Sequence, residues 1–211
     1  MNSKPSVPQK FQFRPSAAAI VGSLAGTVAD LHDRGIVHRR IDASHVVLTP
    51  DDAEALWNVR LEALESEPTG FGSSAAKHRS IPVEEFRSRL TADPADYFFV
   101  GVFTNGNLVG MAGFIREAGE KERHKGMIVG VYLSKDLRGN GIGRAMMQAL
   151  LDRAANIEGL EQIVLRVSST QSAAIATYRS LGFTTFGHEV RALYVDGQYI
   201  DEEYMVWICT S

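Results

Sequence analysis

Seven residues about two thirds of the way along the chain, R-G-N-G-I-G-R at positions 138–144, have the composition of an anion-binding loop. Glycine lets the backbone turn sharply and brings its N–H groups close to a ligand, and a helix that starts there directs the positive end of its dipole to the same point. Such a loop suits a pyrophosphate. It has neither the G-x-G-x-x-G of a Rossmann site nor the G-K-[ST] of a P-loop. Taken alone, it is better explained as a glycine-rich turn without a ligand.

The apolar pattern around this loop predicts the elements that position it. Gly126–Ser134 is almost wholly apolar, as expected of a central strand buried on both faces, and Gly141–Ala155 has the one apolar face of a helix. Tyr97–Thr104 and Leu108–Arg116 flank the hairpin signal Asn105-Gly106-Asn107. The other predicted elements are a strand at His45–Leu48, a helix that begins at Pro50 with Thr49 as N-cap, a loop at residues 66–80, a helix at Pro82–Leu90, a strand at Gln162–Val167, a helix at Ser172–Leu181, and two final strands joined at Asp196-Gly197. This order predicts an α/β fold, in which helices flank a mixed, mostly antiparallel sheet with one parallel crossover in its middle.

Two blocks of the sequence resemble the GNAT superfamily of N-acetyltransferases. The run V-G-V-Y-L-S-K-D-L-R-G-N-G-I-G-R-A-M-M resembles the family's acyl-CoA-binding motif [RQ]-x-x-G-x-[GA], which Arg138, Gly141 and Gly143 match. The run S-T-Q-S-A-A-I-A-T-Y-R-S-L-G-F is similar to the family segment N-x-x-A-x-x-x-Y-x-x-x-G-F. The resemblance covers about residues 45–211. It implies the GNAT fold, in which two central parallel strands splay apart, and it implies acetyl-CoA as cosubstrate.

The resemblance also implies which residues bind acetyl-CoA. The pantetheine arm would lie between the splayed strands and bond to the backbone of Val131, Tyr132 and Leu133, whose N–H groups could also stabilise an oxyanion. The loop amides would hold the pyrophosphate, and Arg138 and Arg144 would add charge-assisted contacts. The implied cofactor-binding residues are Val131, Tyr132, Leu133, Arg138, Gly139, Asn140, Gly141, Ile142, Gly143, Arg144, Gln171 and Tyr178.

Tyr178 is the expected catalytic residue, because it matches the family tyrosine that protonates the departing thiolate. An ordinary phenol has a pKa of about 10 and an ordinary thiol one of about 8.5, so the hydroxyl keeps its proton at neutral pH and can donate it. The alternative is a core tyrosine, since Ile175, Tyr178 and Leu181 fall on one helical face.

Two positions depart from the family pattern. Gln171 stands where the family has an asparagine, which puts its pantetheine contact in question. Some relatives that acetylate protein N-termini carry a glutamate base where this chain has Arg166, which cannot accept a proton. The general base is therefore unassigned. Glu117, His124 and Glu189 could reach the amine, although each is of a type that is usually a solvated surface residue.

The composition excludes several other classes of protein. Of the 211 residues, 45% are hydrophobic and 22% charged, which is neither a disordered chain nor a coiled coil. A net charge of −3 gives no general attraction to nucleic acid or to anionic membranes. The single cysteine, Cys209, cannot form an internal disulfide, and the chain has no zinc-binding cysteine cluster or H-E-x-x-H pattern. We therefore expect no metal and a reducing, cytoplasmic compartment. No stretch reaches the roughly 18–20 apolar residues of a membrane span.

Residues 1–40 are expected to form an N-terminal extension, and residues 41–211 the acetyltransferase domain. Positions 1–15 are polar with three prolines and indicate a tail. Ser16–Ala29 could be a weak secretory signal, but the helical spacing of Ile20, Leu24, Val28 and Leu31 favours an amphipathic helix.

Positions of about 24–48, which include L-H-D-R-G-I-V-H-R-R-I-D-A-S-H-V-V-L, weakly resemble a protein-kinase catalytic loop. Arg40 stands in the place of the catalytic aspartate, and the chain upstream is too short for a nucleotide-binding lobe. A kinase function is therefore not expected.

The sequence thus predicts an acetyl-CoA-dependent N-acetyltransferase that acts on a primary amine of a small molecule or peptide. The alternative is a non-catalytic acyl-CoA-binding sensor or regulatory module. The acceptor cannot be identified from sequence because acceptor sites lie on variable loops, here Glu67–Ser80 and Asp196–Glu203. The resemblance alone suggests a homodimer.

Overall fold

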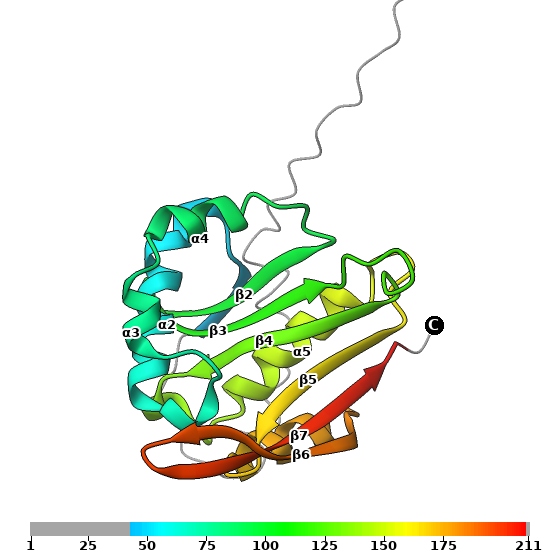
Figure 1. The fold of residues 1–211 in the computed structure, drawn as a ribbon. Helices are drawn as coiled ribbons and strands as arrows, with labels where there is room; N and C mark the ends of the chain where they lie inside the picture. The colour runs from blue at the N-terminus through cyan, green and yellow to red at the C-terminus, as the bar shows by residue number, and fades with distance from the viewer. Residues whose placement is uncertain (1–42, 210–211) are drawn as a thin grey trace, which may run out of the picture. The chain divides into compact units, whose positions relative to one another are not determined.

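Residues 43–209 are described by a computed structural model, and they form a seven-stranded sheet with helices on both faces (Figure 1). The spatial order of the strands is β1-β2-β3-β4-β5-β7-β6. The strands are β1 (Ala43–Val47), β2 (Tyr97–Thr104), β3 (Asn107–Arg116), β4 (Lys125–Leu133), β5 (Gln162–Ser168), β6 (Thr184–Val195) and β7 (Gln198–Ile208). Only the β4–β5 pair is parallel, and every other neighbouring pair is antiparallel. The predicted mixed sheet with one parallel crossover in its middle is confirmed.

Helices α2, α3 and α4 cover one face of the sheet, whereas α5 and α6 cover the other. Their bounds are α2 (Ala53–Ser66), α3 (Ala75–Arg79), α4 (Val83–Arg89), α5 (Ile142–Ala154) and α6 (Ser172–Ser180). A 3-10 turn at Pro50–Asp52 leads into α2. Before it, the Thr49 backbone N–H donates a 2.7 Å hydrogen bond to Oδ2 of Asp52, and the Thr49 hydroxyl donates one of 3.0 Å. These bonds fix the point at which the chain leaves β1.

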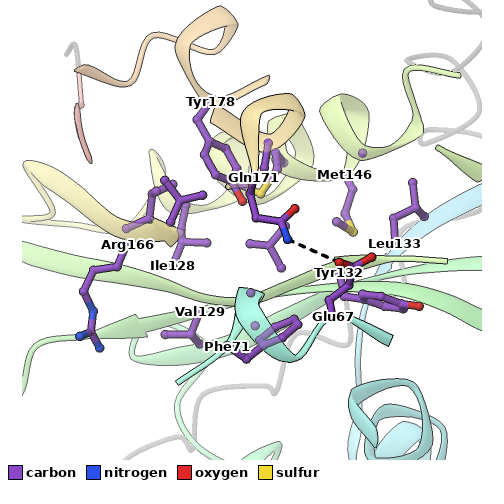
Figure 2. A pocket seen from close by; sticks show the side chains of 18 of the residues that line it. Glu67, Phe71, Ile128, Val129, Tyr132, Leu133, Met146, Arg166, Gln171 and Tyr178 are labelled. Atoms are coloured by element: carbon purple, nitrogen blue, oxygen red, sulfur yellow. Dashed lines mark hydrogen bonds between the residues drawn. The ribbon is translucent and has the colours of Figure 1, made fainter. Parts of the chain in front are cut away.

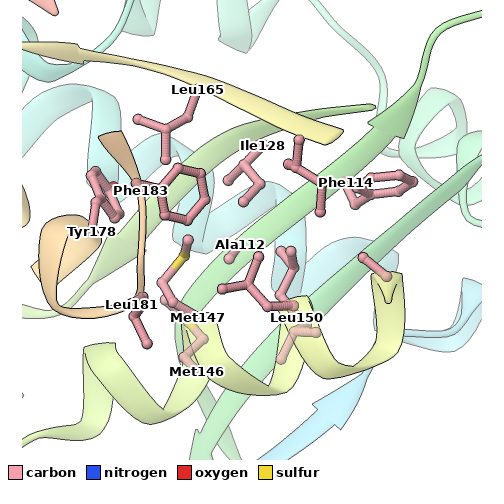
Figure 3. Close-up of a cluster of buried hydrophobic side chains, with 14 of the residues drawn as sticks. Ala112, Phe114, Ile128, Met146, Met147, Leu150, Leu165, Tyr178, Leu181 and Phe183 are labelled. Carbon is pink, nitrogen blue, oxygen red and sulfur yellow. The ribbon is translucent and has the colours of Figure 1, made fainter. Parts of the chain in front are cut away.

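Side chains along β2 point alternately to the two faces of the sheet, and each face contributes to a separate hydrophobic core. Phe98 packs toward α5, beside Phe114, Leu150 and Leu165, and Figure 3 shows this cluster around Met146 and Met147 of α5. Phe99 points to the opposite face, where it meets α2 and α4. Each core buries large apolar side chains, which is the main stabilising term for a sheet between two helical layers.

Three predictions about local structure were wrong. The loop predicted at residues 66–80 contains α3, because Ser74 caps a short helix by accepting a 3.2 Å hydrogen bond from the Lys77 N–H. The run V-R-A-L-Y-V-D-G-Q-Y-I-D predicted a final hairpin that begins at Val190 and is followed by Tyr204–Cys209, whereas β6 already starts at Thr184 and β7 runs without a break to Ile208. The strand predicted to be buried on both faces, β4, is only half-buried at residues 129–131, because β5 diverges from it there.

The N-terminal predictions, including the helix at Ser16–Ala29 and most of the kinase-like stretch, lie outside residues 43–209. The end of that stretch, from Ala43, forms β1 and pairs with β2 as an ordinary edge strand. No helix within residues 43–209 has the length and apolar character to cross a membrane.

Candidate active site

A cavity of about 1120 Å³ opens where β4 and β5 separate. The two strands pair only at Lys125–Met127 with Gln162–Val164. Beyond those residues the edge of β4 that faces β5 has no strand partner, and the cavity occupies the gap. Because it passes between two strands, the cavity is lined by side chains from both faces of the sheet.

A β-bulge shapes β4 at the middle of this cavity. Met111 of β3 pairs with Tyr132, but Gly113 pairs with Val129, so two residues of β4 oppose one of β3. One of these two residues, Gly130, has a φ of +63°, which glycine adopts without strain. The bulge turns backbone groups of β4 away from the regular ladder, at the level where the strand edge is open to the cavity.

The glycine loop forms one end of the cavity. Gly139 and Gly141 have φ values of +78° and +76°, and α5 begins directly after them at Ile142. The first N–H groups of α5 have no partner within the helix, so the loop presents backbone donors at the positive end of the helix dipole. Arg138, Gly139, Gly141, Gly143 and Arg144 all line the cavity, as the anion-site prediction requires.

Two other residues of the loop do not line the cavity. The Asn140 side chain donates hydrogen bonds of 3.3 Å and 3.1 Å to the carbonyls of Leu137 and Arg138, so it supports the loop conformation. Ile142 is buried in the core on the α5 face. Of the remaining predicted cofactor-binding residues, Val131, Tyr132, Leu133, Gln171 and Tyr178 line the cavity.

Glu67, which the sequence did not single out as a site residue, lies at the edge of the cavity beside the glycine loop and pairs with the basic side chains there. Its Oε1 accepts a 2.9 Å hydrogen bond from Nη1 of Arg138 and lies 3.6 Å from Nζ of Lys135. Partial burial by itself raises the pKa of Glu67, but the hydrogen bond and charge of Arg138 outweigh this effect and hold the pKa below its ordinary value. Arg138 also donates a 2.8 Å bond from Nε to the carbonyl of Leu133, so its guanidinium is held in place.

The Gln171 side chain reaches across the cavity to the carboxylate of Glu67. Its Nε2 lies 3.5 Å from Oε2 of Glu67, as the dashed line in Figure 2 marks. Gln171 directly precedes α6, whereas Glu67 directly follows α2, so the contact joins segments from the two helical layers across the gap in the sheet.

Tyr178 of α6 has both features that the sequence offered as alternatives. It is packed in the core, with its ring 6.0 Å from that of Phe183, and it also lines the cavity (Figures 2 and 3). Burial raises the pKa of Tyr178 well above its ordinary value. The hydroxyl therefore stays protonated throughout the neutral range, and within residues 43–209 it forms no hydrogen bond.

The opposite half of the cavity holds residues to which the sequence assigned no binding or catalytic role of their own, although Phe71 and Glu202 lie in the two expected acceptor segments. Three arginines line it, together with one buried carboxylate, Glu202, and a set of aromatic side chains. The arginines are Arg60, Arg89 and Arg166, and the aromatic residues are Phe71, Phe86, Tyr97 and Phe99. Nη1 of Arg166 is 4.0 Å from Oε2 of Glu202. These residues come from α2, α4, β2, β5 and β7 and from the segment after α2, and no spacing in the sequence connects them.

None of the three proposed bases lines the cavity. Glu117 and His124 lie at the ends of the segment that connects β3 and β4, and Glu189 of β6 is exposed and accepts a hydrogen bond from the Tyr204 hydroxyl. Within residues 43–209, no three His, Cys, Asp or Glu side chains gather as a metal site would require. The carboxylates that do line the cavity are Glu67 and Glu202.

Comparison with known proteins agrees with this geometry. The model of the acetyltransferase (GNAT) family matches residues 58–183, which is more than half of the chain. A mycothiol acetyltransferase of Saccharomonospora viridis is 36% identical over 101 residues, which are 46% of this chain and 33% of that protein. A spermidine N(1)-acetyltransferase of Vibrio cholerae is 26% identical over 123 residues, which are 58% of this chain and 69% of that protein. The alignment thus spans only a third of the first of these two relatives.

Solved structures share the fold. A putative acetyltransferase of Salmonella typhimurium, whose structure holds its cofactor acetyl-CoA, superposes with a TM-score of 0.69 at 19% identity over 81% of this chain and 95% of that one. Together, the family match, the shared fold and the two sequence blocks show that the chain belongs to the acetyltransferase (GNAT) family.

Proposed function

We propose that the protein transfers an acetyl group from acetyl-CoA to a primary amine of a small molecule or peptide. The observation that carries this proposal is one continuous cavity between β4 and β5. Its walls include the glycine loop and Tyr178 on one side of the sheet and charged and aromatic residues on the other. Donor and acceptor could therefore approach from opposite faces and meet at the bulge of β4. Such positioning accelerates a reaction between two bound molecules.

The donor half suits a CoA-like molecule. The amides from Gly139 to Arg144 would bind the pyrophosphate, and the Arg144 side chain would add charge. The free edge of β4 at Val131–Leu133 offers backbone groups to the amides of the pantetheine arm. Arg138, already engaged with Glu67, would contribute mainly by shaping the loop.

The transfer itself needs an oxyanion stabiliser, a proton donor and a proton acceptor. The amine nitrogen would attack the thioester carbonyl, and a backbone N–H near the bulge would stabilise the oxyanion. As the C–S bond breaks, the Tyr178 hydroxyl would give its proton to the sulfur. The amine must lose a proton to a base, and Glu202 is the better placed of the two cavity carboxylates, since it lies in the acceptor half with Arg166 4.0 Å away, whereas Glu67 accepts a 2.9 Å hydrogen bond from Arg138.

The role of Glu202 has a direct test. Glu202→Gln keeps the size of the side chain but removes the proton acceptor, so kcat/KM should fall by roughly 10²-fold or more, as for other general bases. Glu189→Gln, at an exposed position opposite Glu202 on the partner strand and outside the cavity lining, is the control and should stay within a few-fold of the parent. If Glu202→Gln also stays within a few-fold, a water molecule takes the proton.

Release of CoA in the presence of an amine panel tests the proposed function as a whole. The panel would contain amino acids, their decarboxylated amines, a polyamine such as spermidine and short peptides, with products identified by mass spectrometry. Acetyl-CoA binding together with acetylation of a panel member supports the enzyme. Binding without any turnover supports the alternative of an acyl-CoA sensor.

Two further expectations belong to this proposal. The single cysteine and the lack of a metal-binding pattern favour a cytoplasmic protein. The homodimer stays a prediction from resemblance, which sedimentation of the purified protein would decide.

A further inference from the structure

Arg60 occupies an unusual position for an arginine. It lies in the middle of α2, on the side of the helix that faces the sheet, between the buried residues Val59 and Ala63. A Cβ placed on Gly130 would be 3.2 Å from its Nη1, so the guanidinium lies directly over the β4 bulge. Arg60 thus brings a positive charge to the point of the cavity where β4 is irregular.

The neighbours of Arg60 do not neutralise it. Within residues 43–209, Arg60 forms no hydrogen bond and no ion pair. The positive charge of Arg89 acts on Arg60 and repels its guanidinium. His78 and Tyr97 are the other titratable groups beside it. Burial, reinforced by Arg89, lowers the pKa of Arg60 below its ordinary value. A half-buried guanidinium without an anion is costly, because it has lost water and gained no partner.

The surroundings of Arg60 are otherwise apolar. Phe71, Phe99, Ile115 and Val129 line the same half of the cavity. The other two arginines there have partners: Arg89 pairs with Glu85 and stacks near Phe86, and Arg166 faces Glu202 and the Tyr204 ring. Among residues 43–209, this half therefore offers one cation without a partner, Arg60, within an apolar wall, which disfavours a polycationic acceptor.

We propose that the acceptor is an amine that carries a carboxylate, an α-amino acid with an apolar side chain, and that Arg60 binds this carboxylate over the β4 bulge. The proposal rests on the proposed acetyl transfer and names its substrate class. A guanidinium recognises a carboxylate through two parallel hydrogen bonds, which fix orientation as well as affinity. The apolar wall would then hold the side chain, which leaves the α-amine free to approach the bulge.

The test compares each substrate with the same molecule without its carboxylate. L-leucine, L-methionine and L-phenylalanine are paired with 3-methylbutylamine, 3-(methylthio)propylamine and 2-phenylethylamine, and kcat/KM is expressed per unit of unprotonated amine. The parent enzyme should prefer at least one amino acid over its amine by at least about tenfold. Arg60→Met should reduce that preference to within about threefold, chiefly through KM, because charged hydrogen bonds of this kind contribute about 10- to 100-fold. Arg60→Lys should retain part of the preference.

Arg79→Met provides the matched control, since Arg79 is an exposed arginine of α3 that pairs with Glu65 outside the cavity. It should keep the full preference. Equal kcat/KM for amino acids and amines in the parent enzyme, or an unchanged preference in a folded Arg60→Met protein, would overturn the role of Arg60 and leave acetyl transfer intact.

A binding measurement separates this proposal from the proposed function. If acetyl transfer fails with every amine, calorimetric titration of N-acetyl-L-leucine, N-acetyl-L-methionine and N-acetyl-L-phenylalanine into the CoA-loaded protein still decides the point. Binding of at least one of them that weakens tenfold or more in Arg60→Met supports a carboxylate site. No binding of any to the parent protein rejects it. If Arg60→Met is unfolded by circular dichroism, Arg60→Gln and Arg60→Lys replace it in the same comparison.

Discussion

Nε2 of Gln171 lies 3.5 Å from Oε2 of Glu67, and this contact spans the gap between β4 and β5 from one helical layer to the other. The same carboxylate is bonded to Arg138, beside the glycine loop. Glu67 thus joins the segment after α2 to the two parts of the donor half that carry the sequence motifs, the glycine loop and the start of α6. The contact with Gln171 is at the long limit for a hydrogen bond, so it holds the side chain only weakly.

Replacement of Gln171 should therefore have a small effect on acetyl-CoA affinity. If its amide stays engaged with Glu67, Gln171→Ala removes one weak neutral contact, and Kd measured by calorimetry should rise by no more than about threefold. A rise of tenfold or more would mean that the amide instead contacts the pantetheine arm, as the asparagine at this position is implied to do.

Replacement of Gly141 should have a much larger effect. A Cβ at this position meets nothing within 4 Å, so the constraint is its φ of +76°, which β-branched residues avoid. Gly141→Val should shift the loop amides and weaken acetyl-CoA binding by at least about tenfold, or ~1.4 kcal/mol.

Gly106→Val is the matched control for that change. Gly106 lies in the β2–β3 turn with a φ of +77° and is equally open around its Cβ, but it does not line the cavity. Both variants should lose similar stability in urea unfolding, and only Gly141→Val should lose affinity. Unchanged affinity in folded Gly141→Val would remove the loop from the cofactor site.

The loop and sheet order were within reach of sequence reasoning because they depend on local signals. The Asn105-Gly106 turn and the glycines before α5 need positive φ, and apolar alternation marks strands wherever they occur. Arg60 was missed for the opposite reason, and Glu202 was placed only within the expected acceptor segment Asp196–Glu203, without a role of its own. Each is a single charged residue on an otherwise ordinary helix or strand, and only the tertiary fold brings α2 and β7 to the same cavity. The apolar composition of β4 indicated burial on both faces and did not encode its half-open character. Only the resemblance to the GNAT fold implied that β4 and β5 diverge, and their short pairing confirms that divergence.

The division at residue 40 has a simple test. Residues 43–209 by themselves supply the seven strands described above and the cavity residues named with them. A shortened protein that begins at Ile41 should therefore bind acetyl-CoA with a Kd within about twofold of the full chain. Lost affinity in a shortened protein with an intact circular dichroism spectrum would give residues 1–40 a functional role.

Stability should fall as the solution is acidified, partly because of His45. His45 is a residue of β1, and its side chain is buried against the start of α5, with Nε2 3.4 Å from the carbonyl oxygen of Ile142. Burial lowers the pKa of His45. Below the unfolded-state pKa of about 6.5, the unfolded chain binds a proton at His45 that the native protein does not, so the free energy of unfolding decreases as pH falls.

Urea unfolding at pH 7.5 and pH 5.5 measures this dependence. His45→Gln should reduce the loss of stability on acidification, although buried His78, whose pKa is lowered in the same direction, keeps part of it. His188→Gln, on the exposed surface of β6, serves as the comparison. An identical pH dependence in His45→Gln and the parent would show that His45 does not contribute.

Tyr178→Phe removes only a hydroxyl from a residue that is packed in the core and open to the cavity. Burial keeps the phenol protonated, so the group is always available as a donor, but no cation among residues 43–209 is bonded to it to stabilise a phenolate. Its benefit should therefore appear when negative charge develops on the departing sulfur, and not in the binding of acetyl-CoA. We expect Kd for acetyl-CoA to be unchanged while kcat falls by roughly 10²–10⁴-fold. The loss should shrink with an acyl donor whose thiol is more acidic, because that leaving group needs less help from a proton.

A purely structural tyrosine would behave differently: Tyr178→Phe would then change the melting temperature slightly and leave kcat within a few-fold of the parent. That outcome, measured where chemistry limits turnover, would identify water as the proton source.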